Sequence, residues 1–377
     1  MGDIRGAGRG ILMAGSVATV LVLEGPGQLV TRDITLPALA PGQAILRVEA
    51  CGLCGTDHEM FSGAMPAPLP LVPGHEVVGV IESATDEFWQ SHPGLGEQAR
   101  VALEVFQRCG ECDPCRHGQY MLCRNHGLRD SYGNTPLDHG SGLWGGYATH
   151  LLLTADAIVH PVPTVLDPVQ ATLFNPLGAG IRWGVNLPSV SAGDVVVVLG
   201  PGLRGLSAVA AAADAGAKYI MLTGVGRRDA ERLQLGVSLG AHAAVDIGVE
   251  DAKAHLKSDT GGLADVVVDV TAAAPAAFVQ AIDLVRPGGT VVVAGTRGHH
   301  TLDSFNPDRI VLKELRVLGA RGVDGAAYTY ALDMLARTPA LREIDHHTAP
   351  LDANEVSTLL HDMAQGAHPP LHAVVTV

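Results

Sequence analysis

The sequence VVVVL at residues 195–199, followed directly by GPGLRG at 200–205, decides the fold of the second half of the chain. The apolar and mostly β-branched run predicts a buried strand, and the alanine-rich run from 205 to 215 predicts a helix. A G-x-G-x-x-G motif between a strand and a helix is typical of a dinucleotide-binding turn. Its glycines allow a tight turn and the close approach of a pyrophosphate, which then faces the helix N-terminus.

The alternation of strands and helices continues after this turn. Val-rich strands separated by helices predict a doubly wound parallel sheet with helices on both faces. Strands are expected at 194–199, 218–223, 264–271 and 290–295, and helices at 205–215, 230–239 and 275–285. The candidate cofactor-binding residues belong to the motif and to the strand ends and turn that follow it: Gly200, Gly202, Leu203, Gly205, Thr223, Arg227, Arg228, Thr271 and Gly295.

The tip of the second expected strand bears on the choice of cofactor. An acidic residue there would bind the ribose hydroxyls of NAD, but the sequence TGVGRR at 223–228 contains none. Arg227 and Arg228 could instead accommodate the 2′-phosphate of NADP. The alternative is that both arginines are solvated loop charges. The sequence therefore favours NADP and leaves NAD open.

Six cysteines lie between residues 51 and 123, in a half of the chain whose short β-branched runs and frequent turn signals predict an all-β unit. Four of them, Cys109, Cys112, Cys115 and Cys123, fall within fifteen residues of a Gly- and Pro-containing loop. Four thiolates this close satisfy a tetrahedral zinc and leave no position open, which indicates a structural site. Free cysteines and an iron–sulfur cluster are the alternatives.

A second group of ligand types precedes that loop. Cys54 and His75 are suitable ligands for a catalytic zinc, which takes three protein ligands and keeps one position for substrate. Asp57 could orient the imidazole of His75, and the hydroxyl of Thr56 could pass a proton to or from the substrate oxygen. Cys51 is interpreted as a small buried hydrophobe.

Composition narrows the class of protein further. The 377 residues carry a net charge of −14, which disfavours nonspecific binding to nucleic acid, and 47% are hydrophobic, enough for a large core. Arg5 and Arg9 precede an apolar run at 11–23, but Glu24 ends that run and no convincing cleavage site follows. We expect a short loose extension, a first strand, no membrane span and a cytoplasmic protein.

The motifs together resemble the zinc-containing medium-chain dehydrogenase/reductase family, which includes the alcohol and polyol dehydrogenases. The motifs CGTD at 54–57, PGHE at 73–76, the four-cysteine loop, GPGLRG, RPGG at 286–289 and KELRVLG at 313–319 occur in the family's order. The resemblance implies a GroES-like β-barrel catalytic domain at 1–172 with an inserted Rossmann domain at 173–318 and a return to the catalytic domain at 319–377. It also implies reversible oxidation of a small-molecule alcohol to an aldehyde or ketone, two zinc ions per chain, and a homodimer or homotetramer.

Two departures from the family pattern affect the catalytic site. Asn175 stands where the family supplies a further Cys, Asp or Glu to the zinc, and an amide oxygen is a weak ligand. We hypothesise that Glu76 ligates directly, as in the polyol dehydrogenases, because its carboxylate and the Cys54 thiolate neutralise Zn²⁺, while Asn175 coordinates weakly or holds a zinc-bound water. Glu59 occupies a position where relatives often carry a relay histidine, and His58 precedes it. Either could relay protons, or both could be ordinary surface residues.

Two other functions compete with the alcohol dehydrogenase. Asn175 motivates a reductase of the same fold that acts on an activated C=C or C=N bond with a weakened or absent catalytic zinc. A non-catalytic nucleotide-binding protein is the other, and the intact set of Cys54, Asp57 and His75 argues against it.

Overall fold

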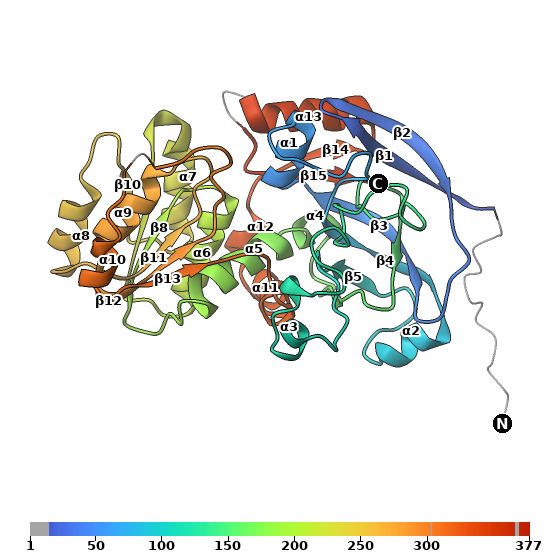
Figure 1. Cartoon of the computed structure of the whole chain (residues 1–377), viewed down its shortest axis with the longest axis horizontal. Helices are drawn as coiled ribbons and strands as arrows, with labels where there is room; N and C mark the ends of the chain where they lie inside the picture. Colours follow the sequence, from blue (N-terminus) through green and yellow to red (C-terminus); the bar gives the residue numbers. More distant parts are fainter. Residues whose placement is uncertain (1–14, 303, 366–368) are drawn as a thin grey trace. The chain divides into compact units, whose positions relative to one another are not determined.

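The computed structural model describes residues 15–302, 304–365 and 369–377 (Figure 1), so the expected N-terminal extension with Arg5 and Arg9 lies outside the described residues. The chain divides into two compact units. Unit 1 combines the chain up to Thr172 with His346–Val377, and unit 2 is Leu173–Asp345. Each unit is described by itself below.

Unit 1 is built on a sheet of seven strands in the order β14-β15-β3-β4-β5-β7, with β6 also paired to β3. All pairs are antiparallel except β14 with β15. The strands are β3 (Ala44–Gly52), β4 (Glu76–Ala84), β5 (Arg100–Leu103), β6 (His150–Leu153), β7 (Val159–Pro161), β14 (His346–Pro350) and β15 (His372–Thr376). Because β15 pairs with β3, the C-terminal segment completes a sheet that the N-terminal half begins.

A hairpin and several short helices complete unit 1. The hairpin consists of β1 (Val17–Gly25) and β2 (Gln28–Thr35), and the apolar side chains of β1 from Ala18 to Leu23 belong to the core. The helices are α1 (Gly55–Ser62), α2 (Asp86–Ser91), α3 (Asp113–Arg116), η1 (Tyr120–Leu122), α4 (Pro168–Ala171) and α13 (Ala353–Gln365). Helix α1 packs on α13, where the rings of Phe61 and His361 meet edge to face at 5.1 Å. This contact fixes the helix that directly follows Cys54.

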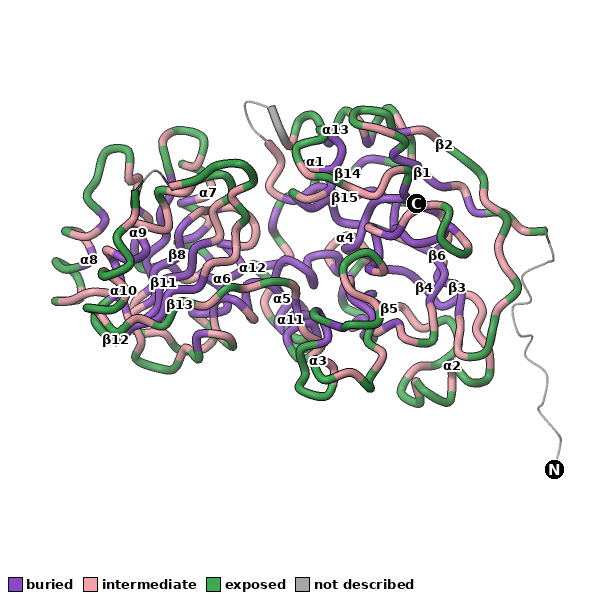
Figure 2. The backbone as a smooth tube through the Cα atoms, in the orientation of Figure 1, coloured by how far each residue is buried: buried purple, intermediate pink, exposed green. Residues whose placement is uncertain are grey.

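Unit 2 has a parallel sheet of six strands in the order β10-β9-β8-β11-β12-β13. The strands are β8 (Val195–Leu199), β9 (Tyr219–Gly224), β10 (Ala243–Asp246), β11 (Ala264–Asp269), β12 (Val285–Val293) and β13 (Arg316–Gly319). The central strands are buried along most of their length (Figure 2), as expected for a sheet with both faces covered. The chain order reverses between β8 and β11, and the carboxyl ends of strands at such a switch point form a ligand crevice.

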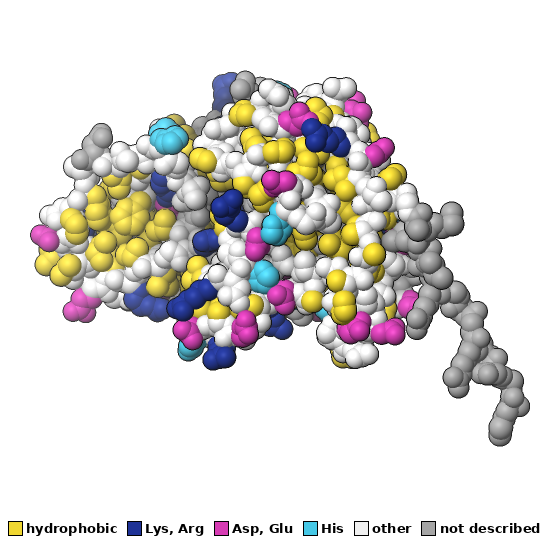
Figure 3. Space-filling view, turned by 45° about the vertical axis from the view of Figure 1, so that its right-hand side comes forward, with side chains coloured by type: hydrophobic (Ala, Val, Ile, Leu, Met, Phe, Trp, Pro, Cys, Tyr) yellow, Lys and Arg dark blue, Asp and Glu magenta, His cyan; other side chains and the backbone are white. Residues whose placement is uncertain are grey.

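The helices of unit 2 are α5 (Phe174–Ile181), η2 (Arg182–Asn186), α6 (Leu203–Asp214), α7 (Gly226–Ser238), α8 (Ala252–Thr260), α9 (Ala276–Leu284), α10 (Asp308–Leu312), α11 (Gly325–Arg337) and α12 (Pro339–Arg342). Helix α7 begins earlier than the expected residue 230. Arg227 and Arg228 therefore lie in the first turn of a helix and not in a loop. Figure 3 shows, at its left, a group of hydrophobic side chains on the surface of unit 2.

The end of unit 2 differs from the sequence-based boundary. The return to the catalytic domain was expected at residue 319, but unit 2 continues to Asp345. Helix α11 packs on α5, where the ring of Tyr328 lies 5.1 Å from that of Phe174. A Cβ on Gly178 would lie only 2.9 Å from the Tyr328 ring, so the glycine permits this close packing. A contact between helices so far apart in the sequence leaves no signal in the local pattern.

Candidate functional site

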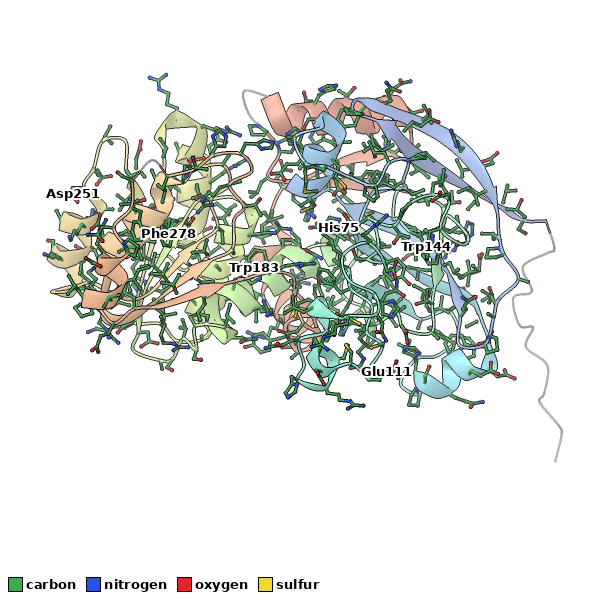
Figure 4. The ribbon with its side chains drawn as sticks, viewed as in Figure 1. His75, Glu111, Trp144, Trp183, Asp251 and Phe278 are labelled. Carbon is green, nitrogen blue, oxygen red and sulfur yellow. The ribbon has the colours of Figure 1, made fainter. Side chains whose placement is uncertain are left out.

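The first group of ligand atoms, which we call the mixed site, comprises Cys54, His75 and Glu76 in unit 1. One ligand atom from each lies within 4.8 Å of the others, and all three residues are buried. Figure 4 labels His75 among the side chains of this unit. Glu76 begins β4 opposite Gly52 of β3, and a Cβ on Gly52 would lie 2.5 Å from the carboxylate oxygen of Glu76. The glycine thus makes room for the carboxylate.

Asp57 ties together the two loops that carry this site. Its Oδ2 accepts a 2.8 Å hydrogen bond from the backbone N–H of Cys54, and its Oδ1 accepts one of 3.3 Å from Gly74. The same Oδ1 lies 3.7 Å from Nδ1 of His75. The carboxylate is buried, so it positions the backbone on both sides of the mixed site.

The electrostatics of the mixed site suit a divalent cation. Burial lowers the pKa of His75, but the negative groups of Asp57 and Cys54 outweigh it and raise the pKa to about 9. Nδ1 of His75 is a buried atom with no hydrogen-bond partner in the described structure. A thiolate, an imidazole and a carboxylate that meet in a buried, negatively charged environment are a donor set that zinc takes in catalytic sites. The residues therefore fit the ion.

The other predicted residues of the reaction follow Cys54 in the first turns of α1. Oγ1 of Thr56 and Nδ1 of His58 are buried atoms to which the described part of the chain offers no hydrogen-bond partner. Glu59 is half-buried on the next position. Their roles in proton transfer stay predictions. Cys51 is fully buried, and burial raises the pKa of its thiol well above the usual value, in keeping with a small hydrophobe.

Asn175 lies in unit 2, where it occupies α5 and is buried. Its Nδ2 donates a 3.0 Å hydrogen bond to the hydroxyl of Tyr328 on α11. This bond orients the amide group, in which the oxygen is the atom suited to ligation. A zinc-related role for Asn175 stays a prediction.

The second group, which we call the four-cysteine site, comprises Cys109, Cys112, Cys115 and Cys123, whose sulfurs all lie within 4.8 Å of one another. Three of the sulfur–sulfur distances are 3.6, 3.9 and 3.9 Å. A tetrahedron of Zn–S bonds of about 2.3 Å has edges of about 3.8 Å, so the residues fit zinc. Backbone N–H groups of Arg124 and Cys115 lower the pKa of Cys112 to about 6, which favours the thiolate that binds metal.

A buried carboxylate anchors the loop of the four-cysteine site. Glu104, which is completely buried, accepts a 2.6 Å hydrogen bond from the hydroxyl of Tyr120 and lies 2.7 Å from Nε2 of His160. Tyr120 lies on η1, between the third and fourth cysteines. Glu104 and His160 could not be predicted from the sequence, because no spacing rule links an isolated glutamate to a histidine 56 positions away.

The fingerprint of unit 2 adopts the geometry that its glycines require. Gly200 has a φ of 100°, and a Cβ on Gly205 would lie only 1.9 Å from the carbonyl oxygen of Gly200. Helix α6 then begins at Leu203 with Gly202 as its N-cap. A cavity of about 870 Å³ opens beside this turn, and Gly200, Thr223 and Thr271 are among its lining residues. The lining does not include the predicted contacts Gly202, Leu203, Gly205, Arg227, Arg228 and Gly295.

Two acidic residues beside the tip of β9, Asp229 on α7 and Asp246 at the end of β10, were not predicted as site residues from the sequence. Asp229 lines the cavity, and its Oδ2 accepts a 2.8 Å hydrogen bond from the N–H of Val225. Asp246 accepts a 2.9 Å hydrogen bond from the backbone N–H of Gly226. Hydrogen bonds from the backbone lower the pKa of the Asp246 carboxyl. Both carboxylates are engaged with the turn, whereas the side chains of Arg227 and Arg228 are exposed.

Comparison with known proteins defines the class. Residues 40–164 match the alcohol dehydrogenase GroES-like domain, and residues 205–337 match the zinc-binding dehydrogenase family. The chain therefore belongs to the zinc-containing medium-chain dehydrogenase family, with a GroES-like and a Rossmann-type unit. It is an oxidoreductase that acts on CH–OH donors with zinc and a nicotinamide cofactor.

Individual relatives agree with this assignment. A Mycobacterium tuberculosis protein named as an alcohol dehydrogenase is 52% identical over 96% of this chain and 99% of its own length. The erythritol/L-threitol dehydrogenase of Mycolicibacterium smegmatis is 32% identical over 80% of this chain and 82% of its own length. These relatives do not favour the alternative reductase or the non-catalytic protein.

Solved structures share the fold. A zinc-binding dehydrogenase of Sinorhizobium meliloti, crystallised with NADP, superposes with a TM-score of 0.79 at 28% identity and covers 96% of this chain and 100% of its own. An alcohol dehydrogenase of Thermotoga maritima gives a TM-score of 0.84 at 24% identity with the same coverage, a likeness of fold alone. Among the described residues, no helix combines the length and apolarity needed to cross a membrane.

Proposed function

We propose that the mixed site holds the catalytic zinc of a reversible alcohol dehydrogenase. The observation that carries this proposal is the convergence of Cys54, His75 and Glu76, with one ligand atom each within 4.8 Å in a buried place. The thiolate and the carboxylate together balance the charge of Zn²⁺. When bound, zinc supplies the Lewis acidity that polarises the oxygen of the alcohol or carbonyl substrate.

The chain's own groups move the proton and hold the ligands in this proposal. Asp57 keeps the backbone of Cys54 and Gly74 in place through its two hydrogen bonds. Thr56 supplies a hydroxyl whose oxygen is buried and lacks a partner in the described structure, as expected of a group that bonds to substrate or cofactor. His58 or Glu59 then carries the proton on toward solvent.

The four-cysteine site holds the second zinc of each chain, which has a structural role. Its sulfur spacing and lowered Cys112 pKa support this assignment. None of the six cysteines forms a disulfide in the described structure, and thiolate ligands need a reducing compartment. We therefore place the protein in the cytoplasm.

The cofactor of this proposal is NADP. Arg227 and Arg228 supply positive charge in the first turn of α7, while the carboxylate of Asp229 is bonded to the backbone of the turn. The expected result is a larger kcat/KM with NADP⁺ than with NAD⁺, and a reversal of that preference in the Arg227→Ala/Arg228→Ala double variant. A wild-type preference for NAD⁺ would contradict the assignment.

The proposed assembly is a homo-oligomer built through the edge of the parallel sheet in unit 2. Strand β13 is the last strand of that sheet, and its Val317 is exposed, as are Val311 and Leu312 just before it. An unpaired edge with apolar side chains favours pairing with a second copy. Light scattering should give a molar mass of at least a dimer. In the Val317→Lys variant the molar mass should fall toward that of a monomer.

One experiment tests the function as a whole. Purified protein is assayed with a panel of alcohols and aldehydes and with both cofactors, following absorbance of the reduced nicotinamide. We expect turnover with at least one alcohol, two zinc ions per chain, and loss of activity in Cys54→Ser. A fully active protein that holds a single zinc per chain would refute the proposal.

A further inference from the structure

Two Arg–Asp pairs link β11 to its neighbour in the sheet, one to the start of β12 and the other to the segment that follows β12. At the amino ends, Nε of Arg286 donates to Asp265 at 2.6 Å, and these side chains are 48% and 24% exposed. Near the carboxyl ends, Arg297 donates to Asp269, and these side chains are 16% and 0% exposed. The pairs share their chemistry but differ in burial and in position relative to the ligand crevice.

Arg297 makes more contacts than a simple ion pair. Its Nη2 donates to Oδ2 of Asp269, while its Nη1 donates to the backbone carbonyls of Thr271 and, at 3.0 Å, of Gly295. Oδ1 of Asp269 accepts the N–H of Thr271 at 3.0 Å and its hydroxyl at 2.6 Å. One guanidinium therefore fastens the segments that leave β11 and β12 to a single buried carboxylate.

These segments border the cofactor turn. Thr271 lines the cavity beside the G-x-G-x-x-G motif, and a Cβ on Gly200 would lie 3.1 Å from the Thr271 methyl group. A Cβ on Gly295 would lie only 1.9 Å from the carbonyl oxygen of Thr271. The guanidinium thus holds in place backbone that packs against the first glycine of the motif.

The side of the sheet identifies the part of the cofactor concerned. A dinucleotide lies across the crevice at the switch point, with one mononucleotide over each half of the sheet. The first turn of α7, which follows β9, carries Arg227 and Arg228 and lies on the side of the sheet that receives the adenosine ribose. Strands β11 and β12 lie on the other side of β8 and so belong to the half that receives the nicotinamide nucleotide.

A contribution to stability does not by itself explain why the ion pair of Arg297 and Asp269 is buried. A buried ion pair loses hydration on both partners, and apolar residues of similar volume often serve as well. Burial indeed raises the pKa of Asp269, although Thr271 and Arg297 oppose the rise. The exposed pair of Asp265 and Arg286 joins the same two strands without that cost.

We propose that Arg297 is a positioning residue for the nicotinamide nucleotide, fixed by Asp269, which sets the backbone of Thr271 and Gly295 at the carboxyl ends of β11 and β12. This inference rests on the proposed use of a nicotinamide cofactor. It predicts a selective effect, because the adenosine half of the cofactor binds over the other half of the sheet.

The test compares whole cofactor with adenosine fragments in Arg297→Met and Arg297→Lys, by calorimetry and by the fluorescence of bound NADPH and NADH. We expect Arg297→Met to weaken binding of NADPH or NADH on the order of tenfold. The affinities for 5′-AMP and adenosine 2′,5′-bisphosphate should change less than about twofold. Arg297→Lys keeps the charge but loses the planar fork, so it should weaken whole-cofactor binding by an intermediate factor.

The matched control is Arg286→Met, which removes the pair at the far ends of the same strands and should leave all these affinities unchanged. An equal loss of fragment and cofactor affinity in Arg297→Met, or no loss at all, would overturn the inference. If Arg297→Met does not fold, Arg297→Lys and Asp269→Asn decide the same question. Wild-type protein that binds neither NADPH nor NADH would refute the proposed cofactor itself, and is thereby distinguished from a failure of Arg297 alone.

Discussion

The two candidate zinc sites of unit 1 both use cysteine but are built in opposite ways. The mixed site is buried and combines three kinds of donor. It includes Nδ1 of His75, a buried atom that, like Oγ1 of Thr56, lacks a partner in the described structure. The four-cysteine site has one kind of donor, three of its cysteines are only partly buried, and a hydrogen-bonded Glu104 supports its loop. Buried polar atoms without hydrogen-bond partners are typical of a site that binds a ligand. Buried polar atoms whose hydrogen bonds are all made within the chain are typical of a site that stabilises the fold.

The largest effect is expected at the carboxylate of the mixed site. Glu76→Ala removes one of the two negative ligands and leaves a net positive site, so zinc should be lost there. We expect kcat/KM to fall on the order of a thousandfold, the loss of several kcal/mol of Lewis-acid stabilisation. Elemental analysis should show one zinc per chain in place of two.

The control for this variant is Glu82→Ala, which removes a carboxylate of the same strand that pairs with His150 at 3.0 Å. That variant should keep both zinc ions and most of the activity. Full zinc occupancy and full activity in Glu76→Ala would show that Glu76 is not a ligand.

The four-cysteine site should show the reverse behaviour. Cys112→Ser removes a sulfur whose pKa is lowered, so one zinc per chain should be lost while the mixed site stays loaded. We expect the unfolding midpoint to fall by roughly 5–10 °C, and residues 105–125 to become sensitive to limited proteolysis.

Cys51→Ser is the matched control, because Cys51 is buried but belongs to neither group of ligand atoms in the described structure. It should keep two zinc ions per chain. Immediate loss of all activity in Cys112→Ser with an intact fold would contradict the division of roles.

A buried histidine beside the mixed site, His372, is expected to make the stability of the fold depend on pH. Burial and the neighbouring His346 lower the pKa of His372 to about 3, and its Nε2 lies 3.3 Å from the Thr172 hydroxyl. Below the unfolded pKa of about 6.5, the unfolded chain binds a proton that the folded chain excludes. Stability is therefore full above pH 6.5 and falls as the pH drops toward 3, by about 2 kcal/mol at pH 5.

His372→Gln should remove this pH dependence, measured as the difference in unfolding free energy from wild type between pH 7 and pH 5. His347→Gln, on the exposed neighbouring position of β14, should keep it. Parallel curves for wild type and His372→Gln would refute the assignment.

Most residues of the two candidate zinc sites and of the cofactor turn could be predicted from the sequence. The four cysteines and the G-x-G-x-x-G motif are each close in sequence, because the chemistry of zinc–thiolate and pyrophosphate binding restricts their spacing. Cys54 and His75 are farther apart, and the four-cysteine loop nearby is what makes them candidate ligands. The choice of Glu76 rested on charge balance, and the structure places its carboxylate with the other two ligand atoms.

Groups that depend on contacts distant in sequence could not be predicted. Glu104 joins His160 across 56 positions, and Arg297 reaches Asp269 across 28. The contact of α11 with α5, which extends unit 2 past residue 319, is of the same kind. A hydrophobic pattern records which face of an element is buried but not which element covers it.

The smallest effect is expected on the free energy of unfolding when either of two tyrosine–carboxylate hydrogen bonds is removed. Tyr120 donates to Glu104, which is completely buried, whereas Tyr330 donates to Asp214, whose side chain is 19% exposed and also receives two hydrogen bonds of 2.8 Å from Arg337. Tyr120→Phe removes a hydrogen bond from a buried carboxylate and should cost about 1–3 kcal/mol, whereas Tyr330→Phe should cost less than about 1 kcal/mol. Urea unfolding measures both costs, and the rate of zinc transfer to a chelator should rise in Tyr120→Phe alone, because η1 lies between two of the cysteines. Equal costs, or an unchanged transfer rate, would show that the loop of the four-cysteine site depends on the metal and not on Glu104.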